Sequence, residues 1–79
     1  MDLEFHTPAT YRIRVKGYLE GKWSDRLGGM TIEVSEQEEG ARETTLVGRL
    51  ADQAALLGVL NTLYSLHLPL LSVELVGTV

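Results

Sequence analysis

The sequence contains no cysteine among its 79 residues. No disulfide can therefore stabilise the fold, and metal sites built from thiolates are excluded. Chains of this length bury a smaller share of their surface than larger domains, and they often need a disulfide, a metal or a partner subunit. With cysteine absent, association into an oligomer is the expected source of further buried apolar area.

Charge is missing from a long segment, because residues 53–73 include no Asp, Glu, Lys or Arg. The apolar residues of 53–67 follow the helical period and cover an arc of roughly 200° around the helix axis. An ordinary surface helix buries little more than ~100°. The segment has the length of a membrane span, but polar residues interrupt it and Pro69 would break the helix near its far end. No membrane contact is therefore predicted.

The rest of the helix circumference carries only small or uncharged residues, which form one stripe: Ala54, Gly58, Asn61, Thr62 and Ser65. A stripe of small side chains lets another backbone approach closely. We predict that the sheet covers the leucine side of the helix and that a second subunit covers this stripe, so that the protein is its own partner in a dimer or higher oligomer. The alternative is a helix buried by its own sheet on one side, with a small polar face left in water.

Positive charge is scarce, with 7 Lys and Arg against 11 Asp and Glu, a formal net charge of −4 and a pI near 5.0. Nucleic acid and anionic lipid would repel such a chain overall, so neither is an expected partner. Residues 1–10 include Asp2 and Glu4 and no apolar run, which is not the pattern of a signal peptide. The sequence therefore predicts a cytoplasmic protein, and its 44% hydrophobic content is typical of a folded domain.

Alternation of apolar and polar residues predicts strands at 11–17, 30–34 and 42–50, and a fourth strand follows the helix at 70–76. Asp52 is placed to cap the helix, and His67 is expected in its last turn before Pro69. The predicted fold is α+β in the order β-β-β-α-β, a four-stranded mixed sheet with one helix packed on one face. Residues 1–9 are expected to form an N-terminal arm, and residues 10–79 a single domain.

The first three strands are predicted to form two antiparallel hairpins, and the third and fourth to run parallel through the helix. The fourth strand is expected beside the first, in spatial order 3-2-1-4, with pairing to the third strand left open. Gly48 is expected where the helix approaches the sheet closely. The core-facing residues of the second and fourth strands are predicted to be Met30, Ile32, Val34, Leu71, Val73 and Leu75.

The segment 18–29 is a glycine-bounded loop, and loops are where binding groups concentrate. Trp23, Asp25 and Arg26 are its candidate ligand-binding residues, since Trp offers contact area and Arg can clamp a carboxylate. The alternative is that Trp23 closes one end of the small core while Asp25 or Ser24 satisfies the turn. The run 27–29 is not a phosphate-binding loop, because it precedes a strand and lacks the required Gly and Lys-Ser/Thr context.

Three basic residues, Arg12, Arg14 and Lys16, share one face of the first predicted strand. They could grip phosphates, but in an acidic chain we expect cross-strand pairs with Glu33 and Glu74 instead. No catalytic set is predicted, since Ser24, Asp25 and His67 lack the context of a nucleophile elbow. His6 and His67 have no further ligands at matched spacing, so neither a metal nor a cofactor is predicted.

Several of these segments together resemble a group of short, uncharacterised bacterial proteins. The resemblance rests on the strand 11–17, the Trp23-Ser24-Asp25 loop, Gly28-Gly29 and the run from Asp52 to Val73, and it covers most of residues 11–76. It implies a compact bacterial α+β domain. It implies no activity, because none is established for the group.

No motif specifies a reaction, so the sequence predicts a small self-associating binding, scaffold or regulatory module and leans away from an enzyme. One alternative is a small-molecule-binding or enzymatic dimer with its site in the 18–29 loop. Another is nucleic-acid binding through the basic face of the first strand.

Overall fold

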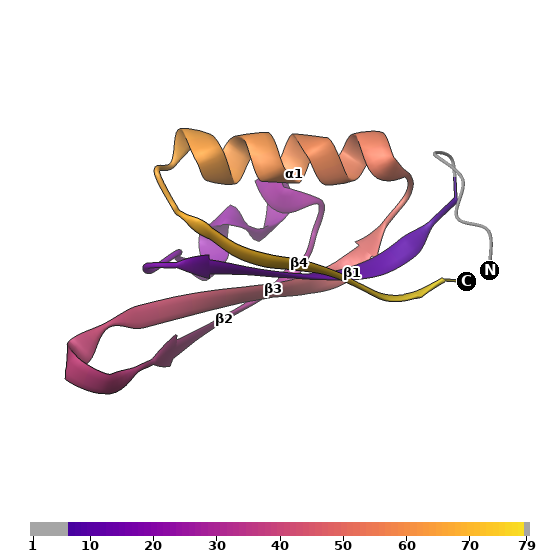
Figure 1. The fold of residues 1–79 in the computed structure, drawn as a ribbon. Helices are drawn as coiled ribbons and strands as arrows, with labels where there is room; N and C mark the ends of the chain where they lie inside the picture. The colour runs from indigo at the N-terminus through magenta and orange to yellow at the C-terminus, as the bar shows by residue number, and fades with distance from the viewer. Residues whose placement is uncertain (1–6, 79) are drawn as a thin grey trace.

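The computed structural model describes residues 7–78, which form one sheet, one α-helix and two short 3₁₀ helices. The elements follow one another as β1 (Ala9–Lys16), η1 (Gly21–Leu27), β2 (Thr31–Glu36), η2 (Glu38–Gly40), β3 (Arg42–Leu50), α1 (Gln53–Ser65) and β4 (Leu70–Thr78). The α+β class and the order β-β-β-α-β are therefore confirmed (Figure 1). Most of the predicted N-terminal arm, residues 1–6, lies outside the described residues, and Ala9 already belongs to β1.

The sheet has the strand order β2-β3-β1-β4, and every pair of neighbours is antiparallel. The predicted mixed sheet and the spatial order 3-2-1-4 are therefore wrong, although β4 does lie beside β1 as expected. The predicted β1–β2 hairpin fails because residues 17–30 separate the two strands, and a tight hairpin turn has only about 2–5 residues. The longer connection lets β3 take the place beside β1, and β2 pairs only with β3.

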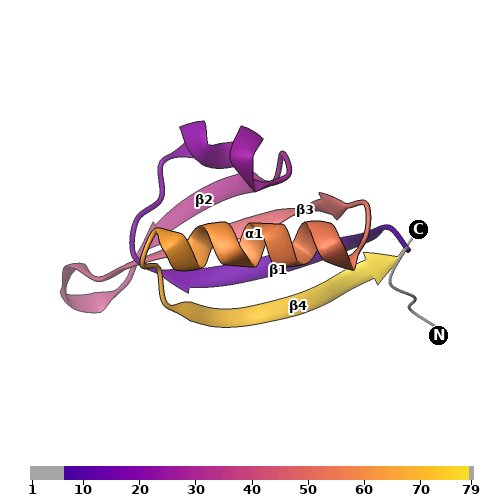
Figure 2. The same ribbon diagram turned by 90° about the horizontal axis from the view of Figure 1, so that it is seen from above.

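The helix covers one face of the sheet, lying over β1 between β3 and β4 (Figures 1 and 2). Segment η1 lies beside the helix on the β2 side (Figure 2) and contacts both elements. The core between these layers is apolar, and its buried members are Ala9, Tyr11, Ile13, Val15, Leu19, Leu27, Met30, Leu46, Leu50, Val59 and Leu63. The predicted inward face of the first strand is thus confirmed.

The β2–β3 hairpin extends beyond the end of the helix (Figure 1). Ile32 is only partly buried and Val34 is exposed, so the prediction that both face the core is wrong for Val34. The close approach predicted at Gly48 is also made by a different element. A Cβ on Gly48 would lie 3.0 Å from the Cα of Met30, so the glycine accommodates the start of β2 and not the helix.

The helix begins where its capping residue predicts. The backbone N–H of Ala55 donates to Asp52 Oδ1 at 2.8 Å, which satisfies one of the free amides of the first turn. The helix ends at Ser65, earlier than predicted, and His67 lies beyond it in a left-handed conformation with φ 60°. The N–H of Leu68 then donates to the carbonyl of Leu63, so the chain reverses into β4.

Strand β4 carries two extra residues relative to β1, and the first of them changes which side chains face the helix. Val15 lies opposite Leu70 while Arg14 lies opposite Ser72, so Leu71 is the additional residue of a bulge. The side of β4 that faces the helix therefore presents Leu70, Val73 and Leu75, opposite the buried Val15, Ile13 and Tyr11. Val73 and Leu75 thus lie on the helix side as predicted, but both are exposed, so the prediction that they face a buried core is wrong, and Leu71 is the bulge residue.

Candidate functional site

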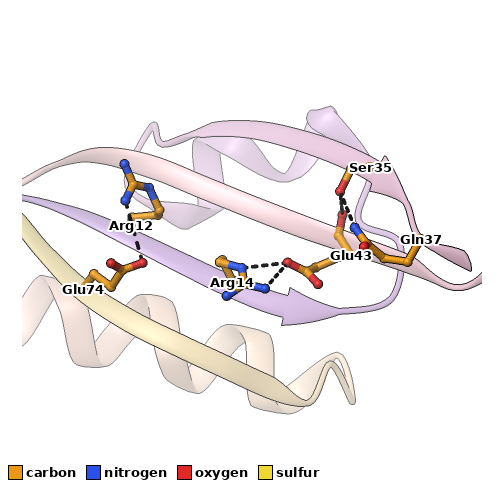
Figure 3. Close-up of polar contacts among 6 residues, drawn as sticks. All are labelled: Arg12, Arg14, Ser35, Gln37, Glu43 and Glu74. Atoms are coloured by element: carbon orange, nitrogen blue, oxygen red, sulfur yellow. Dashed lines mark hydrogen bonds and ion pairs between the residues drawn. The ribbon is translucent and has the colours of Figure 1, made fainter.

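The basic face of β1 lies on the side of the sheet away from the helix, and acidic residues neutralise much of it (Figure 3). Arg14 Nε donates to Glu43 Oε1 at 2.6 Å, and Arg12 Nη1 lies 3.7 Å from Glu74 Oε1. The pairing with Glu74 was predicted, whereas Arg14 pairs with Glu43 on β3 and not with Glu33. Since both arginines face carboxylates, this surface offers few free cations to a phosphate backbone.

Segment η1 is a folded part of the domain and not an open loop. The hydroxyl of Ser24 donates to the carbonyl of Met30 at 2.7 Å, and the N–H of Gly29 donates to the carbonyl of Ser24 at 2.8 Å. Leu27 is buried in the core, and Trp23 packs against that core while staying partly exposed. Trp23 is therefore in part the core cap that the sequence offered as an alternative.

A shallow depression of about 300 Å³ lies on η1, and it is lined by Lys22, Trp23 and Arg26. The guanidinium carbon of Arg26 lies 5.4 Å from the centre of the Trp23 ring, within the range of a cation–π contact. Residues three apart are eclipsed on a 3₁₀ helix, which brings these two side chains together. The exposed Asp25 does not line the depression, so the structure unites two of the three predicted ligand-binding residues.

Lys22 is the lining residue that the sequence reasoning missed. Its ammonium lies 3.5 Å from the Glu20 carboxylate, and both side chains are exposed. Two cations beside one aromatic face can recognise an anion attached to a flat apolar group. A 3₁₀ reading of residues 21–27 would have placed Trp23 and Arg26 on one side, but the glycine spacing suggested an irregular loop.

The described residues 7–78 contain no group of three or more His, Asp or Glu that could hold a metal ion. His6 lies outside these residues. The hydroxyl of Ser24 is engaged by the carbonyl of Met30, so it acts as a turn-stabilising donor. These observations leave the 18–29 segment with binding features and no assembled nucleophile.

The predicted oligomer interface is open to solvent along most of its length. Ala54, Gly58, Asn61 and Ser65 are exposed and Thr62 is partly buried. A Cβ on Gly58 would meet nothing within 4 Å. The hydroxyls of Thr62 and Ser65 donate at 3.0 Å to the carbonyls four residues earlier. The stripe is thus accessible to a partner, and its role as an interface stays a prediction.

A second open surface lies next to the stripe, on the side of the helix towards β4, and most of its members are apolar. Leu60, Asn61 and Tyr64 line a groove of about 310 Å³ together with Leu70 at the start of β4. Leu57 lies one turn before Leu60, on the same side of α1. We call this surface the apolar band and define it by Leu57, Leu60, Tyr64, Leu70, Val73 and Leu75.

Side chains of the apolar band are far more exposed than core positions should be. Tyr64 is 81% exposed, Leu57 60%, Leu70 53%, Leu75 39% and Val73 38%. The helix lies over β1, so it leaves the neighbouring edge strand β4 largely uncovered (Figure 2). Sequence reasoning had assigned the leucine side of the helix to the sheet alone. The wide apolar arc was the available signal that the sheet could not cover it all.

Comparison with known proteins identifies a family and no activity. The model of a domain of unknown function (DUF8691) matches residues 10–74. Nothing among the curated proteins or the solved structures matches the chain. No helix within residues 7–78 is long and apolar enough to cross a membrane.

Proposed function

We propose that this chain, which belongs to the family of the DUF8691 domain of unknown function, is a small self-associating module. It acts by binding, as a scaffold or regulatory protein. The observation that carries the proposal is the apolar band, where large side chains of α1 and β4 stand exposed next to one another. Contiguous apolar patches on a folded protein mark interaction sites, since leaving them in water is unfavourable.

The short chain and its lack of cysteine both favour a second copy over an isolated monomer, because such a chain gains most from additional buried area. The bacterial, cytoplasmic setting that we include in the proposal rests on the acidic composition and on the resemblance to short bacterial proteins.

The first test is the mass of the purified protein at micromolar concentration. We expect sedimentation equilibrium or light scattering to give at least twice the 8.7 kDa of one chain. Addition of moderate salt should leave this mass unchanged, because apolar burial and not charge holds the subunits together. A monomer of 8.7 kDa at all concentrations up to about 100 μM would contradict the proposal.

A second candidate function is the binding of a small anionic ligand by η1. The depression lined by Lys22, Trp23 and Arg26 favours it, with the stacked Arg26 and Trp23 as its aromatic and cationic elements. This function would coexist with self-association through β4, because η1 and β4 lie on opposite sides of α1 (Figure 2).

Replacing Trp23 by alanine separates the structural from the ligand-binding role. Because the ring is partly buried against the core, we expect a loss of about 3 kcal/mol in the free energy of unfolding, the low end for a buried tryptophan. Denaturant melts of both proteins measure this loss. Trp23 is the single tryptophan, so its emission reports the environment of that ring. If the natural protein shows red-shifted emission and Trp23→Ala is as stable as the natural chain, the ring does not stabilise the core and the binding role is favoured.

A further inference from the structure

The two edges of the sheet differ in how well they are protected from other strands. Strand β2 carries Glu33 and Glu36 in its six residues, whereas the nine residues of β4 include one charged residue, Glu74. Charged side chains on an edge strand discourage pairing with another chain. Strand β4 has only β1 beside it within residues 7–78, so the backbone groups of its outer edge are available to a further strand.

We infer that two copies of the chain associate by antiparallel pairing of β4 with β4. The two-fold axis passes midway between the two copies of Val73. This inference rests on the proposed self-association and specifies the surface that produces it. The pairing would join two four-stranded sheets into one continuous eight-stranded sheet, with both helices on the same side. It removes the open edge and brings the two apolar bands together.

The register follows from the symmetry of β4 about Val73. Five residues of β4 lie opposite the five consecutive residues of β1 from Val15 to Tyr11. In that order they are Leu70, Ser72, Val73, Glu74 and Leu75. A two-fold axis perpendicular to the sheet keeps both helices on the same side of it. Such an axis pairs one residue of β4 with the same residue of the second copy, so one of these positions lies at the axis. With Val73 at the centre, Leu70 of one copy faces Leu75 of the other, and the helix side of the interface is entirely apolar.

Charge supports the same register on the other side of the sheet. Glu74 would face Ser72 of the second copy and would lie between its own Arg12, 3.7 Å away, and the second copy's Arg14. The hydroxyl of Ser72 is buried and has no hydrogen-bond partner within the described chain, so a carboxylate in the same row supplies an acceptor. An axis through Glu74 would instead set like charges opposite each other, which destabilises a strand pair.

The helices contribute to this interface without direct backbone contact. Each lies over β1, one strand back from the new junction (Figure 2). Leu60 and Tyr64 line the groove between α1 and the start of β4, and the exposed Leu57 lies one turn before Leu60 on the same side of the helix. In the pair, these side chains from both copies close over the apolar centre of the junction, which explains why residues so exposed in one chain are large and apolar.

Single cysteines test the register directly, because the natural chain has none. Paired residues in antiparallel strands have Cα atoms about 4.5 or 5.5 Å apart, and a disulfide spans about 4.4–6.8 Å. Treated with diamide, Val73→Cys is expected to form a covalent dimer in high yield. Leu70→Cys alone and Leu75→Cys alone should not form a dimer. In each variant the two equivalent cysteines would be four residue steps apart along the strands, about 13 Å. A mixture of these two variants should cross-link.

The outcomes separate this inference from the proposed function. Two results would overturn the β4 pairing centred on Val73 and leave self-association standing. One is a Val73→Cys variant that has the dimer mass but does not cross-link, and the other is a Leu70→Cys variant that cross-links with itself. Gly58→Glu tests the small-residue stripe of α1 as the rival interface, and with β4 pairing it is expected to keep the dimer mass and the Val73→Cys cross-link. If Gly58→Glu gives monomers, the interface is the small-residue stripe of α1 and the inference fails. A monomeric natural chain would overturn the inference and the proposed function together.

Discussion

Replacing Leu27 by alanine is expected to lower the free energy of unfolding by about 2–5 kcal/mol, the range for a buried leucine cut back to its Cβ. Leu27 is the last residue of η1, and its side chain is fully buried. It belongs to the same core cluster as Met30 and Val59, so its removal leaves a cavity between η1, the sheet and the helix. The loss would be a large part of the ~5–15 kcal/mol available to a typical domain.

Denaturant melts at one fixed protein concentration measure this loss, since the stability of an associating protein depends on concentration. Asp25→Ala is the matched control within the same segment, because Asp25 is exposed, and a change there should stay within about 0.5 kcal/mol. Equal midpoints for Leu27→Ala and the natural chain would mean that η1 is not part of the cooperative unit. The depression on η1 would then be a feature of a loosely held loop.

The local structure could be read from the sequence wherever one rule decided it. Alternation placed Tyr11, Ile13 and Val15 on the buried face of a strand, because period-2 patterning has no other stable arrangement against one core. Asp52 marked the helix start, since its carboxylate can accept a free amide of the first turn, that of Ala55. Burial and capping act between near neighbours in sequence, so a single sequence records them.

The strand order was not accessible in this way. The patterns of β1, β2 and β3 are equally compatible with β2 or β3 beside β1, and hairpins between consecutive strands are the more frequent choice. The 14 residues between β1 and β2 contained the decisive information. They include η1, bury Leu27 and connect two strands that are not neighbours. A connection of that length should have counted against a hairpin.

The candidate surfaces were predicted in part for a similar reason. The broad apolar arc of residues 53–67 is wider than one layer can cover, but the prediction that the sheet covers its leucine side is wrong for the exposed Leu57 and Tyr64. Which part stays uncovered depends on where the helix lies across the sheet, and the bulge at Leu71 shifts the facing residues of β4 by one position. Neither the placement of the helix nor a bulge follows from periodicity, so the apolar band appears only in the folded chain.

Gly28→Ala is expected to destabilise the fold by roughly 2–5 kcal/mol, through two separable effects. Gly28 has φ 68°, a left-handed conformation that costs a residue with a Cβ about 1–2 kcal/mol. The added Cβ would also lie 2.7 Å from Cδ2 of Leu50, which is buried and has little room to move. Forcing an extra carbon into a packed core commonly costs about 1–3 kcal/mol more.

The next residue separates the two effects. Gly29 has a similar φ of 73°, but a Cβ there would meet nothing within 4 Å. Gly29→Ala should therefore show the conformational cost alone, about 1–2 kcal/mol. Thermal or denaturant unfolding of the two variants, measured side by side, gives the packing contribution as their difference. Equal losses for both variants would mean that Leu50 moves aside without penalty.

A double-mutant cycle then attributes the difference to one contact. In a Leu50→Ala background the atom that opposes the new Cβ is gone, so Gly28→Ala should cost no more than Gly29→Ala does. The Leu50→Ala change is itself destabilising, but the cycle uses only the difference between backgrounds. If Gly28→Ala keeps its full cost without Leu50, the strain lies in the backbone where η1 turns into β2. The docking of that segment would then depend on the left-handed turn and not on the side chain beneath it.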